Sequence, residues 1–194
     1  MTTKKLIHPR KVVWAMRDFI NEIHNVTYEA FSVTNIPGEP FESWWERFCN
    51  AETEEFKATC KMVRIEENNF CAFLSDKGDS TFRIGYNLNA LQKDRSGFRQ
   101  TFTSQSSVCH GFANVTLALL HELGHFSSQQ EFEDYDREEE LKFLSMIPAE
   151  FAHSMYFLLP DEMSATAWAV EWLQDAENRK IAKRFEKKFF ACFE

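Results

Sequence analysis

The chain has 194 residues, of which 44% are hydrophobic and 27% charged, and its formal net charge is −8. This length suits one well-buried domain spanning residues 1–194, and the twenty Phe and five Trp supply enough apolar surface to exclude a mainly disordered chain. Proteins that bind duplex nucleic acid usually carry a basic surface, so no direct contact with nucleic acid is expected.

Neither the start of the chain nor any later stretch resembles a targeting or membrane-spanning segment. The first ten residues lack the apolar core of a signal peptide, and no apolar run approaches the ~20 residues that cross a bilayer. The five cysteines are odd in number and none are paired at C-x-x-C spacing, which favours reduced, buried thiols. We therefore expect a cytoplasmic protein with no membrane contact.

Hydrophobic spacing predicts helices first and a hairpin after them. Residues 11–24 carry apolar side chains three and four apart, which is typical of a helix, and residues 41–62 are predicted to be helical again. An apolar run, a polar turn and an alternating stretch follow one another over residues 70–88, a pattern typical of a β-hairpin. Residues 92–107 are polar with scattered Gly and Ser, and predict a loop.

The second half of the chain is predicted to be mainly helical. Helices are expected over residues 112–126 and 141–159, the latter with Pro148 near its middle or at a restart, and again after a capping Asp161. A last helix is predicted for residues 180–193. Together with the hairpin, these elements predict an α+β fold in which helices surround a small β-sheet.

The sequence His121-Glu122-Leu123-Gly124-His125 lies inside the helix predicted for residues 112–126. Two histidines four apart project from one face of a helix, one turn apart, where both can bind a Zn²⁺ ion. Glu122 then lies beside the water that such an ion activates, and can act as its general base. The alternative is two surface histidines and a solvated glutamate, which the apolar turns before the motif disfavour.

A third metal ligand must come from elsewhere, and Glu162 is the favoured candidate. The small residues Ala165 and Ala169 follow it on the same helical face, so this helix can pack closely against the motif helix. A solvated first-turn glutamate is the ordinary alternative. Glu131 is another candidate, because it stands six residues after His125, where a metzincin has its third ligand.

These residues resemble the ImmA/IrrE-type metallopeptidases, which are gluzincin-like. The resemblance rests on His121-Glu122-Leu123-Gly124-His125 and on Glu162-x-x-Ala165-x-x-Trp168-Ala169, with Thr166 where the family usually has Asn. It implies that the predicted α+β fold is zincin-like, that His121, His125 and Glu162 bind zinc, and that Glu122 is the base in peptide-bond hydrolysis. It further implies a protein or peptide substrate, with DNA-binding repressors as the family's common targets.

Several other residues remain open to two interpretations. His153 and Tyr156 are candidate hydrogen-bond donors to a tetrahedral intermediate, or ordinary residues of an amphipathic helix. Seven of the ten residues 131–140 are acidic, which favours a solvated loop over a site for a basic substrate. A metal-stabilised binding protein without catalysis, and a relative that binds no metal, remain alternatives to a peptidase. Two His and one carboxylate best suit Zn²⁺, although Mn²⁺ and Fe²⁺ also fit.

Overall fold

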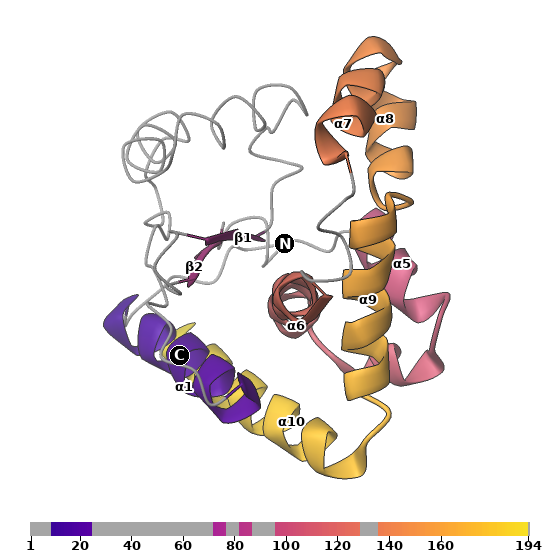
Figure 1. Cartoon of the computed structure of the whole chain (residues 1–194). Helices are drawn as coiled ribbons and strands as arrows, with labels where there is room; N and C mark the ends of the chain where they lie inside the picture. Colours follow the sequence, from indigo (N-terminus) through magenta and orange to yellow (C-terminus); the bar gives the residue numbers. More distant parts are fainter. Residues whose placement is uncertain (1–8, 25–71, 77–81, 87–95, 129–135, 194) are drawn as a thin grey trace.

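The computed structural model describes residues 9–24, 72–76, 82–86, 96–128 and 136–193, and most of these are helical (Figure 1). The elements in chain order are α1 (Pro9–His24), β1 (Ala72–Asp76), β2 (Phe82–Tyr86), α5 (Ser96–Thr103), η1 (Ser107–Gly111), α6 (Asn114–Ser128), α7 (Arg137–Met146), α8 (Ala149–Tyr156), α9 (Pro160–Trp172), α10 (Ala176–Phe190) and η3 (Ala191–Phe193). Helices dominate this part of the chain.

The predicted α+β, zincin-like class with helices around a small sheet is wrong for the part of the chain that is described. Its structure is helical, and its two short strands pair only with each other, as one antiparallel hairpin with Leu74 opposite Ile84. The physical reason is that most of the core side chains that the structure describes come from helices, which pack on one another. The hairpin itself lies where alternation over residues 70–88 predicted it.

Several predicted helices are confirmed, and their boundaries show what local sequence specifies. The first helix buries Met16 and Phe19 along its predicted stripe, and Pro148 separates α7 from α8 as a restart. The helix expected to begin at a capping Asp161 begins instead with Pro160 at its first position, where a missing N–H costs nothing. The helical prediction for residues 41–62 lies outside the described residues.

The loop predicted over residues 92–107 is wrong, because α5 (Ser96–Thr103) occupies much of it. Its polar composition masked an i,i+4 pair, Phe98 and Phe102, that is buried in the core. Their rings stack edge to face with centroids 5.1 Å apart. Burial of these two rings outweighs a local sequence that favours a loop.

The site-bearing helix α6 runs through the centre of the structure, with the hairpin, α9, α5 and α10 around it (Figure 1). Its residues from Val115 to Leu120 are almost completely buried. Helix α10 docks on the same core through Phe185 and Phe189, and packs alongside α1. A helix buried on all sides has few ways to shift, so its side chains are held in fixed positions.

A buried carboxylate from α10 fixes the start of α6. Glu186 is 8% exposed and accepts hydrogen bonds from the Ala113 backbone N–H (2.5 Å) and the Thr116 hydroxyl (2.9 Å). Lys183 pairs with the other oxygen of Glu186 at 2.7 Å. The carboxylate therefore satisfies backbone and side-chain donors at the N-terminus of α6, where helix geometry leaves N–H groups without partners and the dipole favours negative charge.

Candidate metal centre

The candidate centre is built where α6 and α9 cross at very short range. A Cβ added to Gly124 would lie 2.4 Å from the carbonyl oxygen of Ala165 and 2.8 Å from its Cα. Both are far closer than atoms can approach, so this crossing requires Gly at 124. The small residues noted in the sequence therefore have the predicted effect, which is to bring the start of α9 against the middle of α6.

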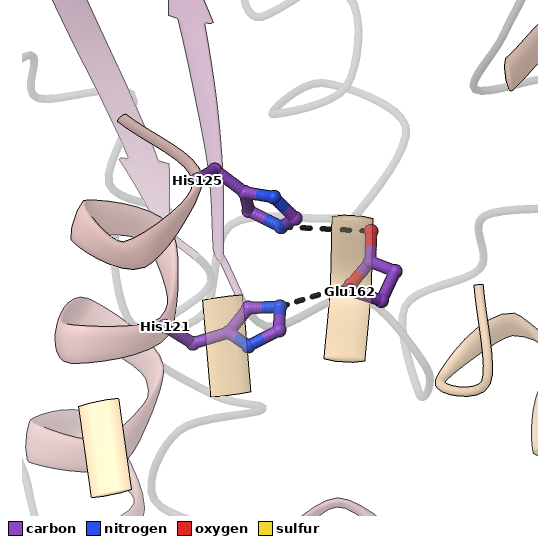
Figure 2. A group of neighbouring side chains, drawn as sticks. All are labelled: His121, His125 and Glu162. Carbon is purple, nitrogen blue, oxygen red and sulfur yellow. Dashed lines mark hydrogen bonds and ion pairs between the residues drawn. The ribbon is translucent and has the colours of Figure 1, made fainter. Parts of the chain in front are cut away.

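Three predicted ligands converge at this crossing (Figure 2). The Nε2 atom of His121 lies 2.9 Å from Oε2 of Glu162, and Nε2 of His125 lies 3.5 Å from Oε1. Glu162 is 1% exposed, and the two imidazoles stand nearly perpendicular with centroids 4.7 Å apart. Figure 2 shows both rings pointing from α6 towards the carboxylate on α9.

This donor set fits a divalent metal ion. One ligand atom from each of the three residues falls within 4.8 Å of the others. Ligand atoms ~2.0–2.2 Å from a tetrahedral zinc ion lie ~3.3–3.5 Å apart, so only small movements separate this arrangement from coordination. Two imidazoles and a carboxylate, buried together between helices, are a set of ligands that would hold a metal ion.

Thr166 and two phenylalanines surround His121. The Oγ1 atom of Thr166 lies 3.1 Å from Nδ1 of His121. When the hydroxyl oxygen accepts a hydrogen bond from Nδ1–H, the lone pair of Nε2 is free to bind a metal. The rings of Phe98 and Phe102 contact His121 edge-on, with centroids 6.4 and 6.1 Å away. Thr166 is therefore placed to orient a predicted ligand.

Arg137, the first residue of α7, connects α7, α8 and α9 at the edge of the centre. Its Nη2 donates to Oε1 of Glu162 (2.7 Å) and to the hydroxyl of Tyr156 (2.9 Å), while its Nη1 donates to Asp161. The predictions from the sequence did not include Arg137, which is the one basic residue of the acidic run 131–140. Its isolated positive charge was the sequence feature that could have indicated a role for it.

The charges of this cluster act on each other strongly. Burial alone would raise the pKa of Glu162, but His125 and His121 outweigh it and hold that pKa well below its ordinary value. Burial and the Glu162 charge raise the pKa of Tyr156, and Glu122 adds to this effect. Burial opposes the charge on Arg137, yet the interactions with Tyr156, Glu162 and Asp161 raise its pKa. Glu162 is therefore an anion, and Tyr156 keeps its proton.

The remaining predicted site residues are placed unevenly. Glu122 stands between the two histidines in the sequence, is buried at 7% exposure in α6, and lies within electrostatic range of Tyr156. Glu131 lies outside the described residues, and the structure describes the backbone of His153 in α8 without its side chain. Of the two candidate hydrogen-bond donors, Tyr156 is connected to Glu162 by Arg137, whose Nη2 donates to both residues. The acidic run 131–140 is not wholly a loop, since α7 begins at Arg137.

Two of the predicted buried thiols are described. Cys109 and Cys192 are free and buried, and burial raises the pKa of each, so both are inert thiols of the core. No helix in the described ranges is long and apolar enough to cross a membrane. Comparison with family models, curated proteins and solved structures found no match to this chain.

Proposed function

We propose that this chain is a zinc-dependent peptidase that cleaves a protein or peptide, with His121, His125 and Glu162 as the metal ligands. The observation that carries the proposal is the convergence of a buried carboxylate on two imidazoles that belong to another helix, 41 residues earlier in the case of His121. A buried, anionic Glu162 is costly unless cations offset its charge; Arg137 offsets part of it, and a metal ion held with the two histidines would offset the rest.

The sequence motif adds a specific chemistry to this geometry. A zinc ion bound by two His and one Glu supplies a Lewis acid that polarises a carbonyl and acidifies water. Glu122 follows the first ligand directly and is buried, and its role would be to take the proton from that water and pass it to the leaving amine. The protonated Tyr156, beside Glu162, is a candidate donor to the oxyanion.

The substrate class rests on the resemblance to ImmA/IrrE-type metallopeptidases. That resemblance favours cleavage of one regulatory protein, such as a DNA-binding repressor, over unselective cleavage of many proteins. Direct contact with nucleic acid forms no part of the proposal.

Metal content of purified variants tests the ligand set. Wild type should bind one zinc per chain, whereas His121→Ala, His125→Ala and Glu162→Ala should each lose it. Two residues provide matched controls, because His110 and Glu171 are both exposed. The controls His110→Ala and Glu171→Ala should keep full zinc. Stoichiometric zinc in all three ligand variants would contradict the site.

Glu122→Gln separates catalysis from metal binding. The amide keeps the size of the side chain but cannot take a proton, so zinc content should stay near one while peptide cleavage falls by ~10²–10⁴. The assay uses candidate repressors encoded beside the gene, followed by mass spectrometry of the products. Equal cleavage by wild type and Glu122→Gln would refute the assigned base. Full zinc with no cleavage by wild type would favour a metal-stabilised binding protein.

A further inference from the structure

Arg137 and the carboxylate of Glu162 form the strongest contact of the metal cluster that the proposed mechanism does not use. Nη2 of Arg137 donates to Oε1 of Glu162 at 2.7 Å. The other oxygen, Oε2, faces Nε2 of His121 at 2.9 Å. The two oxygens of one carboxylate therefore have different surroundings. Oε2 faces His121, whereas Oε1 accepts from the guanidinium and lies 3.5 Å from Nε2 of His125.

Arg137 is itself held on both sides, so its position does not depend on Glu162 alone. Nη1 donates to Oδ2 of Asp161, which is 9% exposed and immediately precedes Glu162. Nη2 also donates to the Tyr156 hydroxyl at 2.9 Å, and the guanidinium lies 5.9 Å from the centre of that ring. A planar fork with contacts in α8 and α9 has little freedom to turn away.

We propose that Arg137 is a positioning residue that keeps Oε1 of Glu162 from the metal, so that Glu162 binds through Oε2 alone. A carboxylate facing a zinc ion can bind through one oxygen or through both, and the second oxygen occupies space that water or substrate needs. The hydrogen bond to Arg137 ties up Oε1, and a cation beside that oxygen also disfavours a second, metal contact there. This inference rests on the proposed metal site and adds the residue that keeps it open.

Arg137 does not touch the reacting atoms in this scheme, and it acts on the metal only through Glu162. Its loss should therefore change the coordination of the metal before it changes the amount of metal bound. In Arg137→Met, Oε1 loses its donor and is free to turn towards the metal. The number of ligands should rise by one oxygen, and the open position should be lost.

Cobalt and zinc spectroscopy of the intact chain provide the test. Purified wild type, Arg137→Met and Arg137→Lys are loaded with one equivalent of Co²⁺, and their visible absorption is compared. Wild type should show the intense bands of a four-coordinate ion, and Arg137→Met should lose most of that intensity. X-ray absorption of the zinc forms should show one additional oxygen neighbour in Arg137→Met. Arg137→Lys keeps the charge but offers no fork, so its spectrum should lie between the two.

Arg179 of α10, which holds the opposite end of α9, provides a matched control. Arg179 donates to the carbonyl oxygens of Leu173 and Gln174 at the other end of α9, at 3.0 and 2.6 Å. Arg179→Met removes a comparable helix-holding arginine, and its cobalt spectrum should match wild type.

The outcomes separate the two proposals. Failure of wild type to bind metal through His121, His125 and Glu162 would remove the proposed function. Metal binding by wild type with an unchanged spectrum in Arg137→Met would overturn the role of Arg137 alone. If Arg137→Met does not fold, Arg137→Lys decides, and a spectrum identical to wild type there would overturn the inference. A change in Arg179→Met as large as in Arg137→Met would overturn it too, since general loosening of α9 would then explain both.

Discussion

Gly124→Ala is the sharpest single test of how the helix crossing positions the candidate centre. The added Cβ would lie 2.4 Å from the carbonyl oxygen of Ala165, whereas ordinary contact begins at 3.4 Å. The two helices must therefore separate by about 1.0 Å at this point, because both atoms belong to rigid backbone. Glu162 is one turn away from Ala165 on α9, so its carboxylate should move away from the histidines by a similar distance.

Two opposing free-energy terms decide the stability of Gly124→Ala. Replacing Gly by Ala inside a helix stabilises the folded state by ~1 kcal/mol, whereas overpacking in a core costs ~1–3 kcal/mol. We expect a net loss of up to ~2 kcal/mol in the free energy of unfolding. Zinc affinity should fall more clearly, by ~10- to 100-fold, as when the groups that orient metal ligands are disturbed.

Chemical denaturation of the metal-free protein and zinc competition against a coloured chelator measure the two effects. The matched control is Gly111→Ala, because a Cβ at Gly111 would meet nothing within 4 Å. Its stability and zinc affinity should stay close to wild type. A Gly124→Ala protein that is more stable than wild type and binds zinc equally well would refute the close crossing.

Three further changes test other contacts of the fold and centre. Thr166→Val removes the hydroxyl beside Nδ1 of His121 and should weaken zinc binding ~10- to 100-fold, whereas Thr166→Ser should retain the affinity of wild type. Equal zinc affinities of the two variants would rule out this orienting contact. Glu186→Ala, measured by urea unfolding, should cost ~2–3 kcal/mol, and Glu177→Ala, in an exposed ion pair, less than ~1 kcal/mol; comparable losses would contradict the capping role. Asp175 caps α10, and hydrogen bonds from the Asn178 and Glu177 N–H groups lower its pKa. Its stabilisation should thus be complete above the unfolded pKa of ~3.9 and be lost as the pH falls through the folded value, a dependence that Asp175→Asn should lack in acid titrations followed by circular dichroism.

The spacing of nearby residues was enough to predict those features that depend on one helix or on one helix contact. The i,i+4 spacing of His121 and His125 needs only a helix to bring both rings to one face, and α6 provides it. Ala165, one turn after Glu162, correctly indicated a close helix contact, because small side chains are the precondition for one. The sequence therefore predicted which three residues, from two distant segments, would lie together as candidate metal ligands.

Other features depended on contacts that no local pattern contains. The contact between Arg137 and Glu162 joins residues 25 apart across two helices, and only the fold brings them together. The predicted fold class was wrong for a related reason. Alternation of apolar and polar residues indicates that a hairpin forms, but not how many further strands join it. The missed α5 shows tertiary burial of Phe98 and Phe102 overriding a polar local sequence.

The carboxylate of Glu186 also has a consequence for the order in which the protein is made. The donors it satisfies at the start of α6 lie 73 and 70 residues earlier in the chain. During synthesis from the N-terminus, α6 and its histidines emerge long before residue 186 is added. Helix α1 likewise cannot pack against α10 until α10 has been made. A nascent chain that ends before residue 186 should hold the candidate metal-binding motif on a poorly anchored helix. Assembly of the centre is therefore expected to be a late event, after α10 has left the ribosome.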